Sequence, residues 1–131
     1  MGNPAAKQGD NVVSAADIHI VMIPTPGGPV ATPLPHPFSG TLDQRLSSDV
    51  NVQGKPAATQ QSVATNTPHV PMGGPFQTPP QNRGEILLGS ASVLINGKPA
   101  ARAADTALTC HDPAAAPTGS VVAVSTVMIG G

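Results

Sequence analysis

Residues 92–105 have the sequence Ser-Val-Leu-Ile-Asn-Gly-Lys-Pro-Ala-Ala-Arg-Ala-Ala-Asp, the fullest copy of a pattern that recurs along the chain. The short apolar run 93–95 predicts a strand. Asn96 and Gly97 form the pair that most readily takes the positive φ angles of a tight turn. Pro99 has no backbone N–H, so it cannot continue into the middle of a sheet. The stretch therefore predicts a strand, a tight turn and a short extended return.

A second, weaker copy occupies residues 50–58, with Gly54 at the turn and Ser62 at the place that Asp105 holds in the first. A third piece at residues 3–10 has the Pro-Ala-Ala and the aspartate but lacks a preceding strand, and residues 126–131, Thr-Val-Met-Ile-Gly-Gly, supply one. We therefore predict that the two ends of the chain join to complete a third unit. Repeats that cannot bury their own faces stack on their neighbours, so we expect three units in a closed arrangement.

The composition predicts a thin core. A chain of 131 residues fits one domain, but its aromatic residues are only Phe38 and Phe76, and it contains 14 glycines and 16 prolines. The side chains that normally bury large apolar areas are therefore missing. Six basic and seven acidic residues, together with β-branched runs, favour short ordered strands over disorder. Such a core usually needs a metal, disulfides or a partner surface, and a single cysteine excludes an internal disulfide.

Charge and hydropathy argue against nucleic acid as a partner and against a membrane-spanning segment. A net charge of −1 without any Lys/Arg cluster gives no electrostatic surface for nucleic acid. No segment approaches the roughly 20 apolar residues of a membrane span. The first residues, Met-Gly-Asn-Pro-Ala-Ala-Lys, lack the basic, apolar and small-residue progression of a signal peptide. We therefore expect synthesis in the cytoplasm without a signal peptide and, if the protein is exported, export by a mechanical route.

Local patterns predict strands and very little helix. Two short strands are expected at 11–13 and 18–23, and the longest strand at 120–129. Six prolines between residues 24 and 37 predict a polyproline-like surface segment that wraps a sheet without joining its middle. A helical turn is expected at 42–46. No stretch of ten residues has a 3.6-residue apolar period free of Pro and Gly, so helix should be scarce.

Soft metal-binding side chains are few. They are four histidines and one cysteine: His19, His36, His69, Cys110 and His111. A structural zinc takes four such ligands at tetrahedral angles. Their spacing matches no zinc-finger pattern, so spacing alone leaves two interpretations open, a metal site or surface histidines with a packed thiol.

Consecutive residues Cys110, His111 and Asp112 offer a nucleophile, a base and an orienting group, but catalytic groups of this kind normally come from separate segments. We therefore expect no enzyme activity.

Asp10 and Asp105 stand at equal offsets from their prolines and are expected to accept backbone N–H bonds at turns. The basic residues at positions 7 and 102 either lie over these carboxylates, contact a partner or are solvated.

The Pro-Ala-Ala-Arg run at 99–102, the Asn-Gly-Lys before it, Asp105 after it and the two weaker copies resemble the PAAR-repeat proteins over essentially the whole chain. These proteins form the pointed tip of the spike in contractile injection machines such as type VI secretion systems and phage-tail-like particles. The proline-dense stretch around His36 and the loop 66–74 resemble the variant found in extracellular phage-tail-like particles.

The resemblance implies a fold. Residues 1–131 should form a single PAAR-repeat domain without an effector extension, an all-β cone of short strands with pseudo-threefold symmetry, adjacent termini and little helix. Its broad end should rest on a trimeric β-helical spike, one tip per trimer, and zinc should close its apex.

The resemblance also implies one structural zinc held by three histidines and one cysteine. The matching positions are His19, His36, His69 and Cys110, of which three follow the repeats at comparable places and His36 lies in the proline-rich segment. Adjacent residues in extended chain point to opposite sides, so His111 is expected outside the site, although it remains the alternative to His36. Four protein ligands leave no open position for water on the metal, which argues against hydrolysis.

The function implied is mechanical. The tip should sharpen the spike, help it to pierce the target envelope, touch the target membrane only on firing, and leave the cell or enter the target on contraction. Any cargo effector should be a separate chain. Two alternatives share the same residues: a stand-alone zinc-stabilised adaptor or chaperone module, and a small zinc hydrolase.

Overall fold

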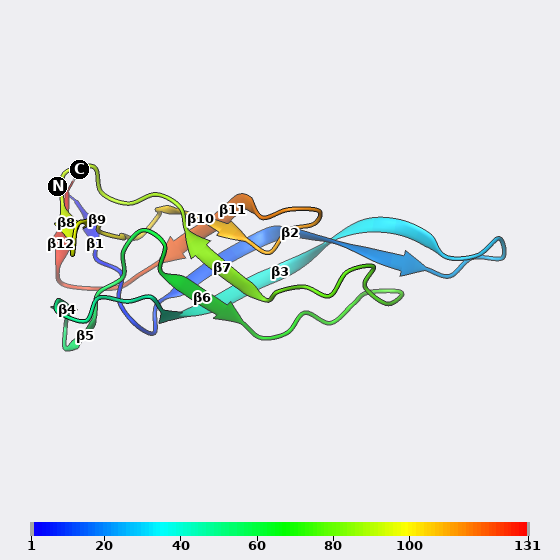
Figure 1. The fold of residues 1–131 in the computed structure, drawn as a ribbon, viewed down its shortest axis with the longest axis horizontal. Coiled ribbons are helices and arrows are strands. Elements are labelled where there is room, and N and C mark those ends of the chain that lie inside the picture. The colour runs from blue at the N-terminus through cyan, green and yellow to red at the C-terminus, as the bar shows by residue number, and fades with distance from the viewer. Residues whose placement is uncertain (1, 131) are drawn as a thin grey trace.

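The computed structural model describes residues 2–130, and in that part of the chain it contains strands and no helix. Six strands form a closed antiparallel barrel in the order β10-β11-β2-β3-β6-β7, and six shorter ones form three two-stranded sheets (Figure 1). The strands are β1 (Asn3–Pro4), β2 (Asn11–Ile23), β3 (Val30–Gln44), β4 (Asn51–Val52), β5 (Lys55–Pro56), β6 (Val63–Asn66), β7 (Arg83–Ile86), β8 (Leu94–Ile95), β9 (Lys98–Pro99), β10 (Thr106–Thr109), β11 (Ala116–Val122) and β12 (Met128–Ile129). The all-β fold predicted from the repeats is confirmed. Over residues 2–130, no helix is available to span a membrane.

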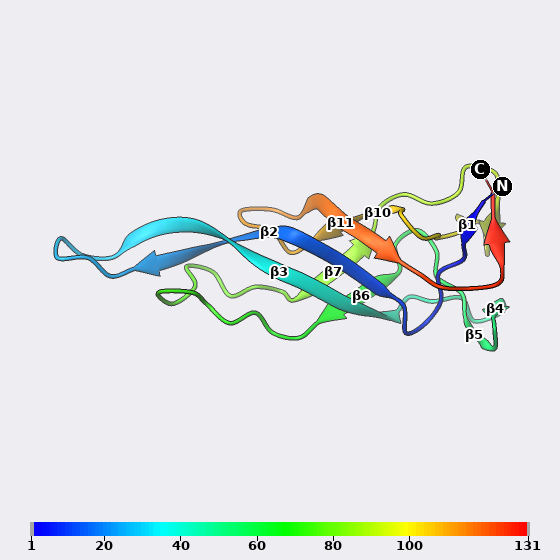
Figure 2. The ribbon, with the colours of Figure 1, turned by 180° about the vertical axis from the view of Figure 1, so that it is seen from behind.

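The three short sheets are one hairpin repeated three times. β4 pairs with β5, β8 with β9, and β1 with β12, and each proline opposes the first residue of the partner strand: Pro56 and Asn51, Pro99 and Leu94, Pro4 and Met128. The third hairpin joins strands from opposite ends of the chain, so N and C lie side by side (Figures 1 and 2). The predicted third unit is confirmed, while Met1 and Gly131 at the joint lie outside the described residues.

Both continuous hairpins turn as the sequence predicts. Asn96 and Gly97 have φ angles of 52° and 78°, and Gln53 and Gly54 have 51° and 80°. Two successive positive φ angles match the twist of the flanking strands. The turn chemistry of the repeat therefore sets the geometry of its hairpin.

The Pro-Ala-Ala segments meet in a ring of backbone hydrogen bonds. Ala6 donates to the carbonyl of Ala101 at 2.9 Å, Ala101 to that of Ala58 at 3.1 Å, and Ala58 to that of Ala6 at 3.0 Å. All six alanines of the three copies are at most 1% exposed. Because three backbones approach one another here, a methyl group is the largest side chain that the ring leaves room for.

The residue that ends each copy accepts the same backbone hydrogen bond. Oδ2 of Asp10 accepts from the N–H of Lys7 at 3.0 Å, Oδ2 of Asp105 from that of Arg102 at 2.7 Å, and Ser62 Oγ from the equivalent N–H at 3.0 Å. The predicted role of the two aspartates is confirmed. The side chains of Lys7 and Arg102 also pair with these carboxylates, at 3.1 and 2.8 Å, and the hydrogen bonds to Asp105 raise the pKa of Arg102 above its ordinary value.

The long hairpin of β2 and β3 differs from the sequence-based expectation. β2 is one continuous strand with an irregularity between Ser14 and Asp17, where two strands were expected, and residues 30–37 of the proline-rich segment form the first half of β3. Pro33 pairs with Ile20 and Pro35 with Ile18. Proline has no N–H to donate, so these are non-hydrogen-bonded pairs of the antiparallel ladder. In such pairs the backbone groups of each residue point away from the partner strand, so the missing N–H groups lie on the free edge of β3. A strand is therefore compatible with this run of prolines.

Two further expectations were wrong. β3 continues to Gln44 and Arg45 has a φ of 55°, so residues 42–46 form no helical turn. The run 120–129 is not a single strand, because β11 ends at Val122 in the barrel and β12 belongs to the third hairpin. In both cases the chain leaves the barrel to reach a repeat, and the local sequence pattern does not predict where this happens.

The core is thin, as the composition predicts. One apolar cluster fills the barrel around Val12, Phe38, Leu42, Ile86 and Val121. A second lies beneath the three hairpins and combines Val52, Ile95 and Ile129 with small alanines.

The molecule is elongated and tapers. The three hairpins form a blunt end that carries both termini, and the β2–β3 hairpin extends beyond the barrel at the opposite end (Figures 1 and 2). The loop between β6 and β7 follows this hairpin, because Met22 donates to the carbonyl of Pro75 and Gln77 to that of Ile20, both at 2.8 Å. The narrow end is thus a hairpin supported along one edge.

The repeats predict a reciprocal pair of substitutions. Gly9 and Ala104 occupy equivalent positions with φ angles of 91° and 73°. Such an angle costs an alanine about 1–2 kcal/mol, and the greater freedom of unfolded glycine offsets part of this. Ala104→Gly should therefore raise the free energy of unfolding by about 0.5–1 kcal/mol and Gly9→Ala should lower it by a similar amount. Urea denaturation of both variants measures the change, and a neutral Gly9→Ala would contradict the equivalence of the units.

Candidate metal centre

Strands β2, β6 and β10 follow the three Pro-Ala-Ala segments, and they all run away from the hairpins because neighbours in the barrel are antiparallel. His19 lies on β2, His69 follows β6, and Cys110 follows β10. The repeats therefore deliver one donor side chain from each unit to the same mouth of the barrel. His36 lies on β3 and pairs with Asp17 of β2, so it reaches the same place from the fourth segment.

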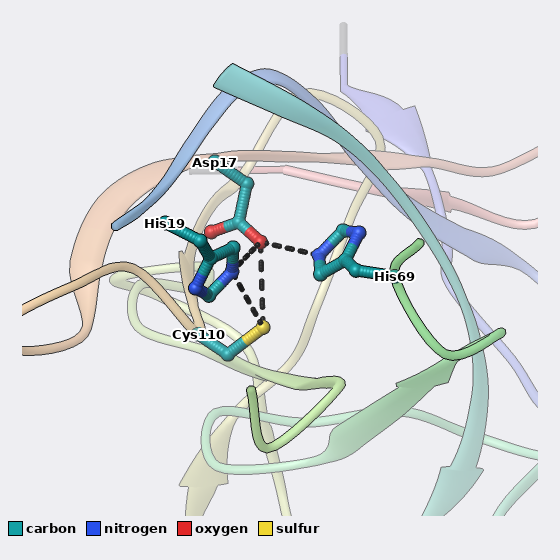
Figure 3. A group of neighbouring side chains, drawn as sticks. All are labelled: Asp17, His19, His69 and Cys110. Carbon is teal, nitrogen blue, oxygen red and sulfur yellow. Dashed lines mark hydrogen bonds and ion pairs between the residues drawn. The ribbon is translucent and has the colours of Figure 1, made fainter. Parts of the chain in front are cut away.

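Three of the four predicted ligands converge in space together with Asp17, and His36 lies beside the group. Asp17, His19, His69 and Cys110 each offer a ligand atom, and the four atoms lie within 4.8 Å of one another (Figure 3). Oδ2 of Asp17 lies 3.0 Å from Nε2 of His19, 2.8 Å from Nε2 of His69 and 3.3 Å from Sγ of Cys110. The Cys110 sulfur lies 3.6 Å from Nε2 of His19. Ligand atoms around a tetrahedral zinc are separated by about 3.3 to 3.6 Å, which the two distances of the Cys110 sulfur match, whereas the imidazole contacts of Asp17 are hydrogen-bond lengths.

The group is buried and carries one firm negative charge. Asp17 and His19 are 0% exposed. Burial works to raise the pKa of Asp17, but hydrogen bonds from Thr109, His19, His69 and Cys110 together hold it below its ordinary value. Burial also lowers the pKa of His69, although Asp17 acts in the opposite direction. The neutral imidazole that metals require is therefore the favoured form of His69.

Cys110 is a protonated thiol in the metal-free chain. Burial, followed by the charge and hydrogen bond of Asp17, raises its pKa to about 11. A thiol of this kind is a poor nucleophile at neutral pH, because the thiolate is the reactive form. A cation bound beside it would favour the thiolate.

His36 stands next to this group with an unused nitrogen. Its Nδ1 donates to the carbonyl of Leu34 at 2.9 Å, because a carbonyl can only accept, so in the neutral ring Nε2 is the acceptor nitrogen. Among the described residues that buried Nε2 has no hydrogen-bond partner. The His36 ring centroid lies 5.7 Å from those of both His19 and His69. An orphaned, buried lone pair beside three converging donors fits a metal ligand.

A second carboxylate lies behind His19. Oδ2 of Asp112 lies 3.5 Å from Nδ1 of His19 and accepts the backbone N–H of Ile20 at 3.0 Å. At that distance Nδ1 of His19 has no hydrogen-bond partner among the described residues, so Asp112 is a nearby negative charge for the ring. Asp112 was considered from the sequence only as part of a consecutive triad with Cys110 and His111.

That triad does not form. Sγ of Cys110 contacts Asp17 and His19, whereas Nδ1 of His111 bonds to the backbone carbonyl of Asp112 at 2.9 Å. Within the described residues, His111 is not a member of the converging group. The side chains of Cys110 and His111 therefore contact different groups, although the two residues are adjacent in the chain.

Asp17 was missed by the sequence analysis. It could have been found from the sequence, because residues 17 and 19 of a strand point to the same face. A carboxylate two residues before a candidate ligand therefore lies near the same site. The donor set of imidazoles, thiol and carboxylate, with the unpartnered Nε2 of His36, fits a zinc ion.

One comparison with known proteins finds a family model that matches part of the chain. The family model described as PAAR motif matches residues 76–131, which include the fullest repeat and the strand of the joined hairpin. No curated protein matches the chain. The matched region contains Cys110, whereas the three histidines that surround it precede the match.

The raised pKa of Cys110 predicts a pH-dependent stability of the chelator-treated protein. The pKa is about 11 in the folded chain against an ordinary value of 9.0, so the stability due to the neutral thiol is complete below pH 9 and is lost as the pH rises towards 11. Cys110→Ser keeps a hydroxyl in place of the thiol but does not titrate in this range. Melting temperatures between pH 8 and 11 should fall more steeply for the wild type. Parallel profiles would contradict the prediction.

Proposed function

We propose that the chain is a PAAR-repeat protein, a family of spike tips in contractile injection systems, and that one copy caps a trimeric spike and helps it to pierce the target envelope. The observation that carries the proposal is the ring of hydrogen bonds among Ala6, Ala58 and Ala101. The ring gives one chain three nearly equivalent hairpins at its blunt end. A monomer built in this way can present similar surfaces to all three subunits of a trimer.

The blunt end offers apolar contacts to a partner. Leu94 and Met128 occupy the same position of the repeat and are 61% and 55% exposed, and Asn51 is the polar equivalent in the remaining hairpin. Val50 and Val127, which precede these positions, are also exposed. Apolar side chains gathered on one end of a small protein favour an interface, and a partner there would also cover the open edges of the three short hairpins.

The narrow end supports the piercing role through its lack of charge. Residues 18–42 and 56–82 contain no Asp, Glu, Lys or Arg, and they build the protruding hairpin and the loop beside it. Apolar side chains are exposed there: Val30, Val70 and Met72 are 51%, 78% and 50% accessible. A charged side chain at the centre of a bilayer costs about 2.5–3.5 kcal/mol on insertion scales, so a charge-free tip crosses an envelope at lower cost.

We further propose that one structural zinc is held by His19, His36, His69 and Cys110. These residues come from β2, β3, the loop after β6 and the residue after β10, so an ion would tie four segments together near the mouth of the barrel. Binding energy of a structural zinc is folding energy, which suits a domain with a thin core. The role that we propose for zinc is thus to hold these four segments of the tip together.

We also propose that residues 1–131 form one domain. The tip would join the spike before contraction and leave with it, to the outside of the cell or into the target. Cargo effectors would attach as separate chains, an expectation that rests on the family alone.

One pair of substitutions separates assembly from penetration. Leu94→Asp places a charge on the blunt end, and we expect at least a tenfold loss of co-purification with the purified spike trimer. Val30→Asp places the same charge on the narrow end and should leave co-purification unchanged while lowering delivery by assembled particles. Mass spectrometry of the same particles identifies any cargo chain that is retained only with the tip.

Retention of spike binding by Leu94→Asp, with loss in Val30→Asp, would reverse the proposed orientation. Native mass spectrometry of the complex tests the stoichiometry, for which we expect one tip per three spike chains. Equal delivery by Val30→Asp and wild-type particles would remove the charge-free tip as support for piercing.

The proposed ligand set predicts the zinc content of four proteins. Elemental analysis should find one zinc per chain in the wild type and in His111→Ala, and a loss of zinc and of melting temperature in Cys110→Ser and His36→Ala. Zinc retained in His36→Ala but lost in His111→Ala would identify His111 as the ligand. A wild-type protein purified without chelator and free of zinc would overturn the cohesive role of the metal.

A further inference from the structure

Asp17 is a buried carboxylate at the point where the candidate ligands converge. It is 0% exposed, and both of its oxygens are engaged. Oδ1 accepts from the hydroxyl of Thr109 at 2.6 Å, and Oδ2 lies within 3.3 Å of donor atoms of His19, His69 and Cys110. A single oxygen therefore serves as the common acceptor for three side chains from three different segments.

This arrangement sets the orientation of the donor atoms before any ion is present. For Asp17 to accept from both imidazoles, His19 and His69 must turn their Nε2 atoms towards one point, 3.0 and 2.8 Å from the same oxygen. The thiol of Cys110 turns to that point as well, at 3.3 Å. Without the carboxylate, these three polar groups would face one another in a buried space with no shared acceptor, which is unfavourable.

Charge gives Asp17 a second role. Three neutral imidazoles and one thiolate leave a zinc ion with a net charge of about +1, and an uncompensated buried charge is costly. Among the described residues, Asp17 is the carboxylate whose oxygen lies within the ligand group itself, whereas Asp112 lies behind His19. One further negative charge at this place brings the whole centre to neutrality.

We propose that Asp17 is a fifth member of the metal centre. Its carboxylate gathers His19, His69 and Cys110 in the metal-free chain and supplies the second negative charge when the ion is bound. The inference rests on the proposed zinc site and adds to the proposed ligand set a residue that the set does not contain. A purely structural Asp17 would only link β2 to Thr109 of β10, through the hydrogen bond of its other oxygen.

Asp17→Asn tests the charge while keeping the shape and an oxygen for Thr109. The matched control is Asp105→Asn, a buried aspartate of a repeat that makes its hydrogen bonds to Arg102 outside the ligand group. Competition with a chromogenic chelator measures zinc affinity directly. We expect Asp17→Asn to weaken it by about 10- to 100-fold and Asp105→Asn to leave it unchanged, although both lower the melting temperature.

Asp17→Glu keeps the charge and covers the case in which Asp17→Asn folds poorly. Its zinc affinity should lie between those of the wild type and Asp17→Asn. Cobalt provides a spectroscopic readout, since the thiolate-to-cobalt band should remain in every variant that keeps Cys110, while the visible d–d bands should change in Asp17→Asn. A merely structural residue would leave both the affinity and the d–d bands unaltered.

The outcomes distinguish this inference from the proposed function. Wild-type affinity and wild-type cobalt bands in Asp17→Asn would overturn the role of Asp17 and leave the zinc site standing. No zinc or cobalt bound by the wild-type protein would overturn both. Weaker binding in Asp105→Asn to the same degree as in Asp17→Asn would assign the loss to general destabilisation and would also overturn the role proposed for Asp17.

Discussion

The closed ring of hydrogen bonds among the three Pro-Ala-Ala segments is the constraint on which the rest of the fold depends. Each segment donates to one neighbour and accepts from the other, so no segment can be placed without the remaining two. Gln8, Gln60 and Ala103 repeat the pattern one layer away by donating to the carbonyls of Pro56, Pro99 and Pro4, at 2.8 to 2.9 Å. Because backbone groups supply the ring, methyl-sized side chains are required, and large ones would separate the chains. This explains how an ordered fold arises with two phenylalanines and no other large aromatic residue.

The ring also sets the direction of the barrel. Every Pro-Ala-Ala copy is followed by a turn whose carboxylate or hydroxyl accepts a backbone N–H, and then by a barrel strand that leaves the blunt end. Three outgoing strands must end together at the opposite mouth. The convergence of His19, His69 and Cys110 is thus a consequence of the repeat, although none of the three lies within a copy.

The freestanding half of the β2–β3 hairpin raises the usual problem of exposed strand edges. One edge is covered, since Asp112 and residues 75–77 bond to the outward groups of β2. On the other edge, Pro33 and Pro35 remove the donors that a further strand would need. Proline therefore does here what charged edge residues do in many sheets, and it does so without placing a charge on the narrow end.

Much of this could be predicted from the sequence, because the repeats carry local chemistry. Asn96 with Gly97 specifies a turn, and Pro-Ala-Ala specifies a tight backbone approach, so the three units and the joined termini followed from short-range patterns. The strand β3 did not, since six prolines in 14 residues normally exclude a strand. Their alternation at 33, 35 and 37 places the missing donors on one edge, which is the pattern that a single edge strand allows.

The candidate site likewise contains residues that the sequence predicts and one that the sequence analysis did not assign. The three residues that follow the repeats could be assigned by their place in each unit, and the two-residue spacing places Asp17 on the strand face of His19. Which side chains that face meets depends on the pairing of β2 beyond its irregularity, which spacing does not encode. The converging group and the alanine ring lie at opposite mouths of the barrel and hold it by different means. At the blunt end the chains are close enough for backbone hydrogen bonds. At the narrow end they diverge into loops, so only side chains can span the gap, and buried polar side chains require a shared acceptor or a shared ion. A thin apolar core is sufficient between two such closures, because neither mouth depends on it.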